Sequence, residues 1–451
     1  MEISEEDRSL IQKLKNRIDS YGTADATNER YYRGSQKIGS LGLAVDERFR
    51  QFAFPLNWCR TYVDVLCERM DVRMLIRTGD ISEDPELRRD WERNDLDTES
   101  LKFARDLLVL GRAALSVAAD PDGDRPIIRV ESPKSLAVEV DPVTRETVAA
   151  LRTYKQSDGR DLAQVLYRPN YTIYTRRVKG EEVAKRIDHG LGRVPIVMAF
   201  NRDTSDDWFH GETQLADLKP LVNMAGRVVM NLQVAIESTA TPQKVATGVS
   251  KQDFQDENGK PIKDPWKVYL GAMLVLGNKD AKVYQLDGAS LSGYLDSIKM
   301  LAEQASTVTG LPVRMMGQNS VNPAAEGAIR ADESRLVKQV ERVNRTTGKA
   351  YAWALGVAER IRTRTWDSDG NIAVIFHDPG TPTEAQKADA MQKYTGGKPM
   401  LSVRGALNEM GFSQARIDRE IQWLQDEENG LDYQVMEKIG RIGGPQLQGE
   451  T

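Results

Sequence analysis

One long helical pattern organises the chain: NPAAEGAIRADESRLVKQVERVNRTTGKAYAWALGVAERIRTRTW, residues 322–366. Apolar or small residues recur along it at steps of three, four or seven: Ile329, Leu336, Val340, Val343, Thr347, Ala350, Ala354, Val357 and Ile361. This spacing predicts a single helix with one buried stripe. At 1.5 Å per residue the helix would be about 60 Å long, whereas the average globular helix has only about a dozen residues.

The start of this helix carries the usual signals. Asn322 suits the N-cap, Pro323 suits the first helical position, and Glu326 places an acid near the positive end of the helix dipole. Three glycines lie inside the helix and are candidate bends or close contacts: Gly327, Gly348 and Gly356. Taken alone, the stretch fits either a core helix of a large helical protein or the spine of an elongated subunit.

Composition narrows the class of protein. The 451 residues include 29% charged and 40% hydrophobic side chains, with a formal net charge of −5, which is ordinary for a globular protein. No apolar run approaches the roughly 20 residues that a membrane span needs. The acidic N-terminus, MEISEED, does not resemble a signal peptide. We therefore expect the protein to be made in the cytosol, and any DNA contact to be weak, local or sliding, because phosphate binding normally needs a basic excess.

Cysteine and histidine usage argues against a catalytic or metal centre. Cys59 and Cys67 lie eight residues apart on a predicted helix, about 12 Å along its axis, which is too far for a disulfide. They are expected to be structural thiols. Only three histidines are present, His189, His210 and His377, and none has a neighbour at metal-ligand spacing. We expect no metal and no cofactor.

The first half of the chain passes from helices to strands. Helices are predicted over residues 4–19, 28–34, 57–70, 85–93 and 98–110. Short alternating segments then predict an antiparallel β region with strands at 113–118, 126–130, 136–140, 147–154, 162–167, 172–177 and 194–200, separated by turn residues. The fold class is therefore α+β.

The second half is mainly helical. Helices at 220–240 and 290–309 flank a small β insert, and a short loop, residues 312–321, leads into the long helix. The segment Ile372–Phe376 predicts one strand, which we expect to return to the earlier β region. Three helices follow at 383–394, 400–410 and 413–428, and the Gly-rich, Gln-rich tail from Gly440 is expected to be disordered.

Motifs for phosphate binding and hydrolysis are missing from the sequence. The segment Thr395–Pro399, TGGKP, has neither the upstream glycine nor the following Ser or Thr of a P-loop, so a loop is the better interpretation. Two segments resemble half of a calcium loop, DPDGD from Asp120 and DSDGN from Asp367. Both lack the glycine at position six and the glutamate at position twelve, which favours turns.

The order of elements and several local motifs resemble the portal proteins of tailed bacteriophages, in particular those of long-tailed phages of actinobacterial hosts. The motifs include YYRG from Tyr31, NWCR from Asn57, ESP from Glu131, TGLP from Thr309 and NPAAEGAIR from Asn322. Each motif alone is weak, but their order over residues 20–430 is specific.

The resemblance implies a ring of about twelve subunits at one capsid vertex, around a channel for double-stranded DNA. It implies a portal fold with these parts: wing 1–210, first stem helix 211–242, clip 243–288, second stem helix 289–310, tunnel loop 311–322, long wing helix 323–366, returning wing strand 367–379, crown helices 380–430 and tail 431–451.

Such a protein has no enzymatic activity of its own. Its partners would be the terminase large subunit, head-completion or adaptor proteins, major capsid and scaffolding proteins, and DNA, with no membrane. It would be assembled in the host cytoplasm and located in the virion.

Three groups of residues are candidate functional sites. Those expected to face the channel are Arg314, Met315, Met316, Gln318 and Asn319, with Arg314 touching phosphates. Those expected to meet the motor or adaptor are Asp264, Trp266, Lys267 and Tyr269. Those expected to pack helices or subunits are Leu232, Ile236, Ile298, Leu301, Ile329, Leu336, Val340 and Val343. Two alternatives remain open: the two methionines plug the space between long helices, and Trp266 belongs to the core of the insert.

Two other functions compete with this interpretation. One is a minor head or connector protein that binds the capsid without forming a channel. The other is a metal-dependent nuclease built from acids distant in sequence, which no motif supports. A ring with an axial hole would favour the portal, whereas metal-dependent cleavage of plasmid DNA would favour the nuclease.

Overall fold

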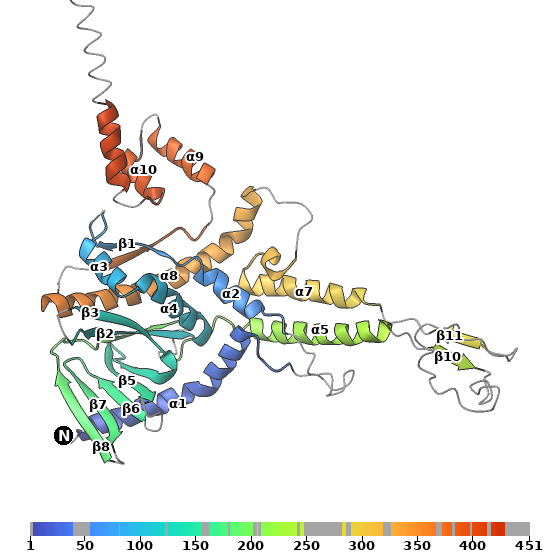
Figure 1. Cartoon of the computed structure of the whole chain (residues 1–451), viewed down its shortest axis with the longest axis horizontal. Helices are drawn as coiled ribbons and strands as arrows, with labels where there is room; N and C mark the ends of the chain where they lie inside the picture. Colours follow the sequence, from blue (N-terminus) through green and yellow to red (C-terminus); the bar gives the residue numbers. More distant parts are fainter. Residues whose placement is uncertain are drawn as a thin grey trace, which may run out of the picture.

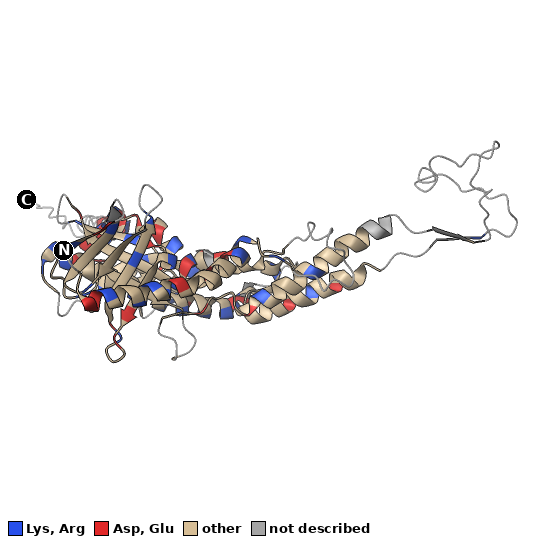
Figure 2. Cartoon of the chain, turned by 90° about the horizontal axis from the view of Figure 1, so that it is seen from below, with Lys and Arg blue, Asp and Glu red and all other residues tan. Residues whose placement is uncertain are grey.

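The chain forms an elongated molecule in the computed structural model (Figure 1). The structure describes residues 3–38, 55–80, 82–121, 125–155, 162–178, 181–201, 205, 209–240, 244–247, 282–285, 290–318, 326–366, 372–380, 384–396, 399–412 and 416–428. A mixed α/β body occupies one end, two long helices project from it, and the C-terminal helices lie on another side of the body. Lys, Arg, Asp and Glu are interspersed over the body (Figure 2).

The body contains a five-stranded antiparallel sheet in the order β4-β5-β6-β7-β8. Its strands are β4 (Leu136–Val140), β5 (Thr147–Lys155), β6 (Leu162–Tyr167), β7 (Tyr171–Val178) and β8 (Glu181–Asp188). The sequence pattern predicted the first four strands and missed β8. This strand is an edge with almost every side chain exposed, so it shows no alternation of apolar and polar residues, and its charges protect the open edge.

A second sheet has the order β3-β2-β9, all antiparallel. It is formed by β2 (Arg112–Ala119), β3 (Pro126–Glu131) and β9 (Ile196–Phe200). The hairpin β2–β3 was predicted from its turn, and β9 closes the sheet from a position about 80 residues further along the chain. Ala114, Leu136, Val138, Ile196 and Phe200 join the two sheets in one small apolar cluster.

The N-terminal helix α1 (Glu5–Arg33) is one continuous helix of 29 residues. The prediction of two helices, 4–19 and 28–34, was therefore wrong. The apolar stripe stops after Tyr21 because the next buried positions are polar: Asp25 forms a buried ion pair with Arg112 at 2.5 Å, and Asn28 accepts a hydrogen bond from Lys219. Tertiary partners that a helical pattern cannot show thus extend α1 by three turns.

The main core surrounds the long helix α8 (Glu326–Thr363). Packed around it are α2 (Trp58–Cys67), α3 (Pro85–Arg93) and α4 (Leu96–Leu110). Trp91 of α3 meets Tyr351 of α8 edge-on, with ring centroids 5.2 Å apart. The predicted cap residues Asn322 and Pro323 lie outside the described residues.

The strand β12 (Ile372–Phe376) has the predicted bounds but a different partner. It pairs with β1 (Val72–Arg77) in a separate two-stranded sheet and not with the earlier β region, so that expectation was wrong. The sequence did not predict β1. The β12 strand packs on α8 at Gly348, where a Cβ would stand 3.1 Å from the ring of Phe376.

Two helices project from the body side by side, α5 (Leu218–Ala240) and α7 (Ser292–Thr309) (Figure 1). At their far end lies a short ladder of β10 (Lys244–Thr247) with β11 (Lys282–Gln285). The predicted strands around 266–270 and 273–276 lie outside the described residues. On another side of the body are α9 (Glu384–Thr395), α10 (Val403–Glu409) and a helix at residues 416–428. Arg73 of β1 binds the backbone carbonyl and the side-chain oxygen of Asn408, which ties α10 to the body.

Candidate functional sites: the loop before the long helix and the paired helices

The chain reverses direction between α7 and α8 at a position that requires glycine. Gly310 has φ of 69°, and a Cβ there would lie 2.9 Å from atoms of Arg335 and Gln339. Gln339 Nε2 donates to the carbonyl of Thr309 at 2.9 Å, and Arg335 donates to that of Thr307. The end of α7 is therefore fixed on α8 by side chains of the long helix.

The loop itself begins with a 3₁₀ turn, Val313–Met316. Met316 is buried at 4% exposure, and the half-buried Met315 packs against the main core. This burial favours the alternative in which the methionines fill space between helices. Gln318 is half-buried, while Asn319 lies outside the described residues.

Arg314 makes ion pairs with the long helix. Its guanidinium lies 2.9 Å from Asp332 and also binds Glu333, whose other carboxylate oxygen lies 3.0 Å from Arg69. Arg69 donates in addition to the carbonyl of Pro379 at 3.0 Å. The Arg314 side chain is 35% exposed, so it lies at the surface, and its charge is already paired with Asp332 and Glu333. A phosphate that approached it would compete with two carboxylates.

The paired helices bury one face against each other and the body. Leu301, Ala302 and Ala305 of α7 are buried, as are Val222 and Ala225 of α5. Of the residues predicted to pack there, Leu301 is 3% exposed, Leu232 and Ile298 are half-buried, and Ile236 is 45% exposed. A second set of large apolar side chains on the two helices remains exposed: Met224, Ile236, Leu295, Met300 and Val308.

The predicted packing residues of α8 also divide into buried and exposed ones. Leu336, Val340 and Val343 are buried within the chain itself, at 0–3% exposure. Ile329, near the start of the helix, is 36% exposed. The four residues proposed to contact a motor or adaptor, Asp264, Trp266, Lys267 and Tyr269, lie outside the described residues.

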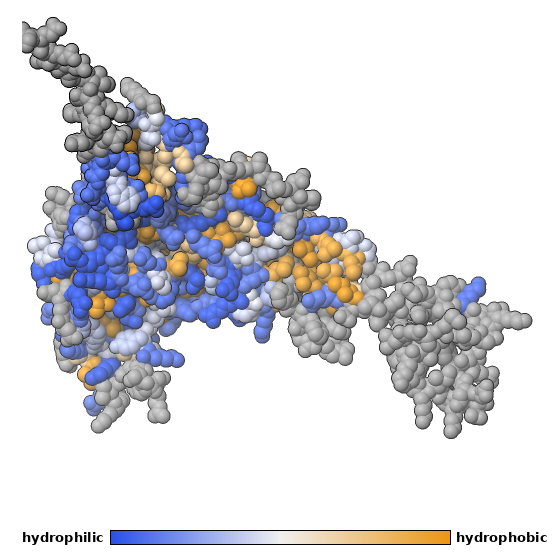
Figure 3. All heavy atoms as spheres, turned by 45° about the horizontal axis from the view of Figure 1, so that its top comes forward, coloured by the Kyte–Doolittle hydropathy of each residue, from blue (hydrophilic) through white to orange (hydrophobic). Residues whose placement is uncertain are grey.

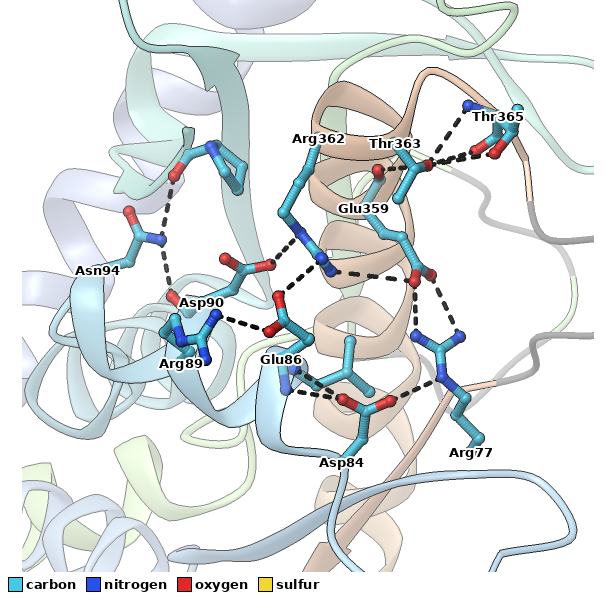
Figure 4. A network of polar contacts seen from close by, with 12 residues as sticks. Arg77, Asp84, Glu86, Arg89, Asp90, Asn94, Glu359, Arg362, Thr363 and Thr365 are labelled. Carbon is cyan, nitrogen blue, oxygen red and sulfur yellow. Dashed lines mark hydrogen bonds and ion pairs between the residues drawn. The ribbon is translucent and has the colours of Figure 1, made fainter. Parts of the chain in front are cut away.

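An ion-pair network that was not predicted anchors the other end of α8 (Figure 4). Arg77 of β1 lies 2.7 Å from Asp84 and 2.5 Å from Glu359 of α8. The hydrogen bond to Glu359 raises the pKa of Arg77, against the effect of burial. Asp84 also caps α3 by accepting from two backbone N–H groups. Burial opposes the charge on Asp84, but these bonds and Arg77 lower its pKa.

The second half of this network centres on Arg362 of α8. It lies 2.8 Å from Glu86 and 3.5 Å from Asp90, whose side chain is only 4% exposed. Burial raises the pKa of Asp90, and Arg362 opposes that rise. Since Glu86 and Arg362 are 276 residues apart, no local pattern could have predicted the pair. The network holds a helix in position and has the character of a structural anchor.

Within the described ranges, no group of three or more His, Cys, Asp or Glu could hold a metal ion. The two thiols are buried, and desolvation raises the pKa of Cys59 and of Cys67 to about 12. As predicted, they are structural and are not joined. A membrane-spanning helix was also sought, and none of the described helices has the necessary length and hydropathy.

Comparison with known proteins adds the family. The model of the family described as "Phage portal protein, SPP1 Gp6-like" matches residues 11–431. The chain belongs to this phage portal family. Its function is that of a portal protein, and the expected family is confirmed.

Two related portal proteins come from phages of an actinobacterial host. The portal protein of Mycobacterium phage D29 is 31% identical over 417 residues, which cover 89% of this chain and 85% of that protein. The portal protein of Mycobacterium phage L5 is 32% identical over 418 residues, with the same coverage of both chains.

Solved structures of a gene transfer agent (GTA) are also similar. One described as "Neck of native GTA particle computed with C12 symmetry" has 13% identity and a TM-score of 0.49, covering 86% of this chain and 99% of that one. One described as "Virion of native gene transfer agent (GTA) particle" has 13% identity and a TM-score of 0.48, covering 81% and 92%.

Proposed function

We propose that this portal protein assembles into a closed ring of about twelve subunits at one vertex of the capsid, and that the ring encloses a channel for double-stranded DNA. The observation that carries the proposal is a set of large apolar side chains that the paired helices leave exposed. In a single copy, α5 and α7 bury part of their apolar surface against each other and the body and leave the rest in solvent.

The paired helices expose several large apolar side chains. Met224, Leu295 and Met300 are each about half exposed, at 47%, 51% and 53%. The paired helices show a broad hydrophobic area in the space-filling view (Figure 3). Because apolar surface in water costs roughly 25 cal/mol per Å², contiguous patches of this kind mark interaction sites. Packing α5 of one subunit against α7 of the next would bury these side chains all around a ring.

In this proposal the regions keep the expected roles. The body, residues 1–210 with the strand in 367–379, is the wing, crossed by α8. The two projecting helices are the stem, the insert 243–288 is the clip, and residues 380–430 are the crown. The loop 311–322 faces the channel. There Gln318 and Asn319 would offer a neutral polar collar, while Arg314 remains paired with α8.

The balance of charge suits a conduit. Each neutralised phosphate adds salt-dependent affinity, so a basic lining would hold DNA and slow its passage. A net charge of −5 and an arginine already bound by carboxylates are compatible with sliding.

We further propose that the protein has no enzymatic activity, that a terminase supplies the packaging force at the clip, and that adaptor, capsid and scaffolding proteins bind the assembled ring in the virion.

Electron microscopy of the purified full chain tests the ring. A turbine-shaped particle with an axial hole and about twelvefold symmetry is expected, and a chain that stays monomeric with and without scaffolding protein would contradict the proposal.

The loop has a separate test in DNA packaging. Gln318→Ala with Asn319→Ala should leave rings intact and change the rate or extent of packaging into proheads, since neither residue is proposed to join subunits. Unchanged packaging would remove these two residues from the channel role.

A further inference from the structure

The strand β9 is a sheet edge that faces a cavity. It is the last strand of the three-stranded sheet, and a slot of about 470 Å³ lies beside it. All five residues from Ile196 to Phe200 line the slot. Because side chains alternate between the faces of a strand, a lining by every consecutive residue indicates that the slot runs along the backbone edge.

The register shows which backbone groups point into the slot. Val117 N donates to Pro195 O at 2.9 Å and Asn201 N donates to Gly111 O at 2.8 Å. With the pairing of β2 and β9, these bonds make Val197 and Ala199 the hydrogen-bonded partners of β2. In an antiparallel ladder the intervening residues direct their N–H and C=O to the opposite side. Ile196 and Met198 therefore point to the open edge, and no described residue bonds to their backbones there.

Two other sheet edges in the body are occupied. On β3, Asn94 accepts from Ile128 N at 2.9 Å and donates to Pro126 O at 3.3 Å. On β4, Arg17 of α1 donates to the carbonyl of Val138. Natural proteins cover or block free edges to prevent unwanted pairing. The open edge of β9 at Ile196 and Met198 thus differs from the edges of β3 and β4, because no described side chain bonds to its backbone groups.

The walls of the slot are basic. Arg345 and Lys349 project from α8, are both exposed, and have no ion-pair partner among the described residues. Arg145, from the turn between β4 and β5, stands on the other wall, where Glu146 contributes the one carboxylate of the lining. Trp353 closes the slot, with the guanidinium of Arg193 4.5 Å from its ring centroid.

The spacing of the cations matches that of a strand. Arg345 and Lys349 are four residues apart on a helix, with Cβ atoms about 5–6 Å apart. Alternate residues of a strand are about 6.6 Å apart and point the same way. Two acidic side chains at positions i and i+2 of an extended peptide would therefore reach both cations, while its backbone meets Ile196 and Met198.

We propose that the slot beside β9 is a docking site for an extended acidic segment of another protein, which adds a fourth strand to the sheet. Main-chain bonds to the open edge give such an interaction its affinity, and the flanking side chains give it specificity. The alternating apolar residues of the segment would lie against the opposite wall.

A fluorescein-labelled hexapeptide of alternating glutamate and valine is the probe, and its binding to the purified full chain is followed by anisotropy. Saturable binding is expected, at least tenfold weaker for Arg345→Glu and for Lys349→Glu. Arg330→Glu is the matched control, because it makes the same charge change at an exposed position of α8 outside the slot and should bind as the unchanged protein does.

Two modified peptides test the strand pairing. N-methylation of alternate residues removes the N–H groups on one edge of the peptide only. One of the two isomers should lose binding and the other should keep it.

Four results would overturn the proposal: no binding of the glutamate peptide, equal binding of a lysine–valine peptide, equal binding of both N-methylated isomers, or displacement of the peptide by a short DNA duplex. The last would make the slot a phosphate site instead.

Discussion

At the scale of the residue, buried charge decides several properties of this portal protein. Asp106 of α4 makes no ion pair with any residue that the structure describes, and burial raises its pKa from 3.8 to about 6, with Lys134 opposing and Glu29 adding to the rise. The folded state thus binds this proton more tightly than the unfolded chain does. The protonated Asp106 carboxyl therefore contributes stability that is fully present below about pH 4, and this stability is lost as the pH rises through about 6.

Asp106→Asn should therefore stabilise the protein at pH 7.5 and have almost no effect at pH 4. The rise of the Asp106 pKa from 3.8 to about 6 corresponds to roughly 3 kcal/mol, which is the largest stabilisation expected at pH 7.5. The thermal unfolding midpoints of both proteins across this pH range give the comparison. The same difference at both ends of the range would show that the carboxyl is not the cause.

The carboxylate of Glu333 links two arginines of unequal burial, 13% exposed for Arg69 and 35% for Arg314. Arg69→Ala is expected to cost about 3 kcal/mol, because it leaves a buried charge with one partner fewer and frees the carbonyl of Pro379. Arg314→Ala should cost about 1 kcal/mol or less. Chemical denaturation of both variants measures the order, and a larger loss for Arg314→Ala would refute it.

At the scale of the element, the long helix was predictable and its partners were not. Its periodic stripe gave Leu336, Val340 and Val343 correctly as packing residues of a helix, since each is buried. The bounds of α3 and β12 were also predicted correctly, at 85–93 and 372–376. The true length of α1 and the pairing of β12 with β1 depended on contacts between residues far apart in sequence. Arg77 and Glu359, 282 positions apart, illustrate why a one-dimensional pattern could not show them.

Two glycines of α8, both proposed from sequence as bends or contacts, now separate into different cases. A Cβ at Gly356 would meet nothing within 4 Å, whereas one at Gly348 would press on Phe376. Gly356→Ala should stabilise the protein by up to about 1 kcal/mol through helix propensity. Gly348→Ala should be less stable than Gly356→Ala by about 1 kcal/mol or more, as measured by denaturation. Equal stabilisation by the two substitutions would show that β12 moves to accommodate the added methyl group.

The candidate site was predictable only in part. The position of the loop between two helices followed from Gly310 and Pro312, but the ion pairs of Arg314 did not, because they depend on which face of α8 meets the loop. The basic slot beside β9 was also not foreseen. Its three walls come from segments around residues 145, 198 and 347, and only the fold brings them together.

At the scale of the whole molecule, the proposed ring would divide the apolar surface between folding and assembly. Val343→Asp places a charge in the chain's own core, so it should unfold the wing and, as a consequence, prevent rings. Leu295→Glu with Met300→Glu changes only exposed positions. It should keep the thermal midpoint of the monomer and abolish the ring, which mass photometry can measure. A ring that survives the double substitution would place the subunit interface elsewhere.

The most direct test of the proposed ring is a cryo-electron microscopy reconstruction of the assembled full-length protein. The expected result is a closed ring in which α5 of one subunit packs against α7 of its neighbour, with Met224, Leu295 and Met300 buried between them and the loop after α7 nearest the axis. A ring in which these three side chains remain in solvent, or one with no axial channel, would contradict it.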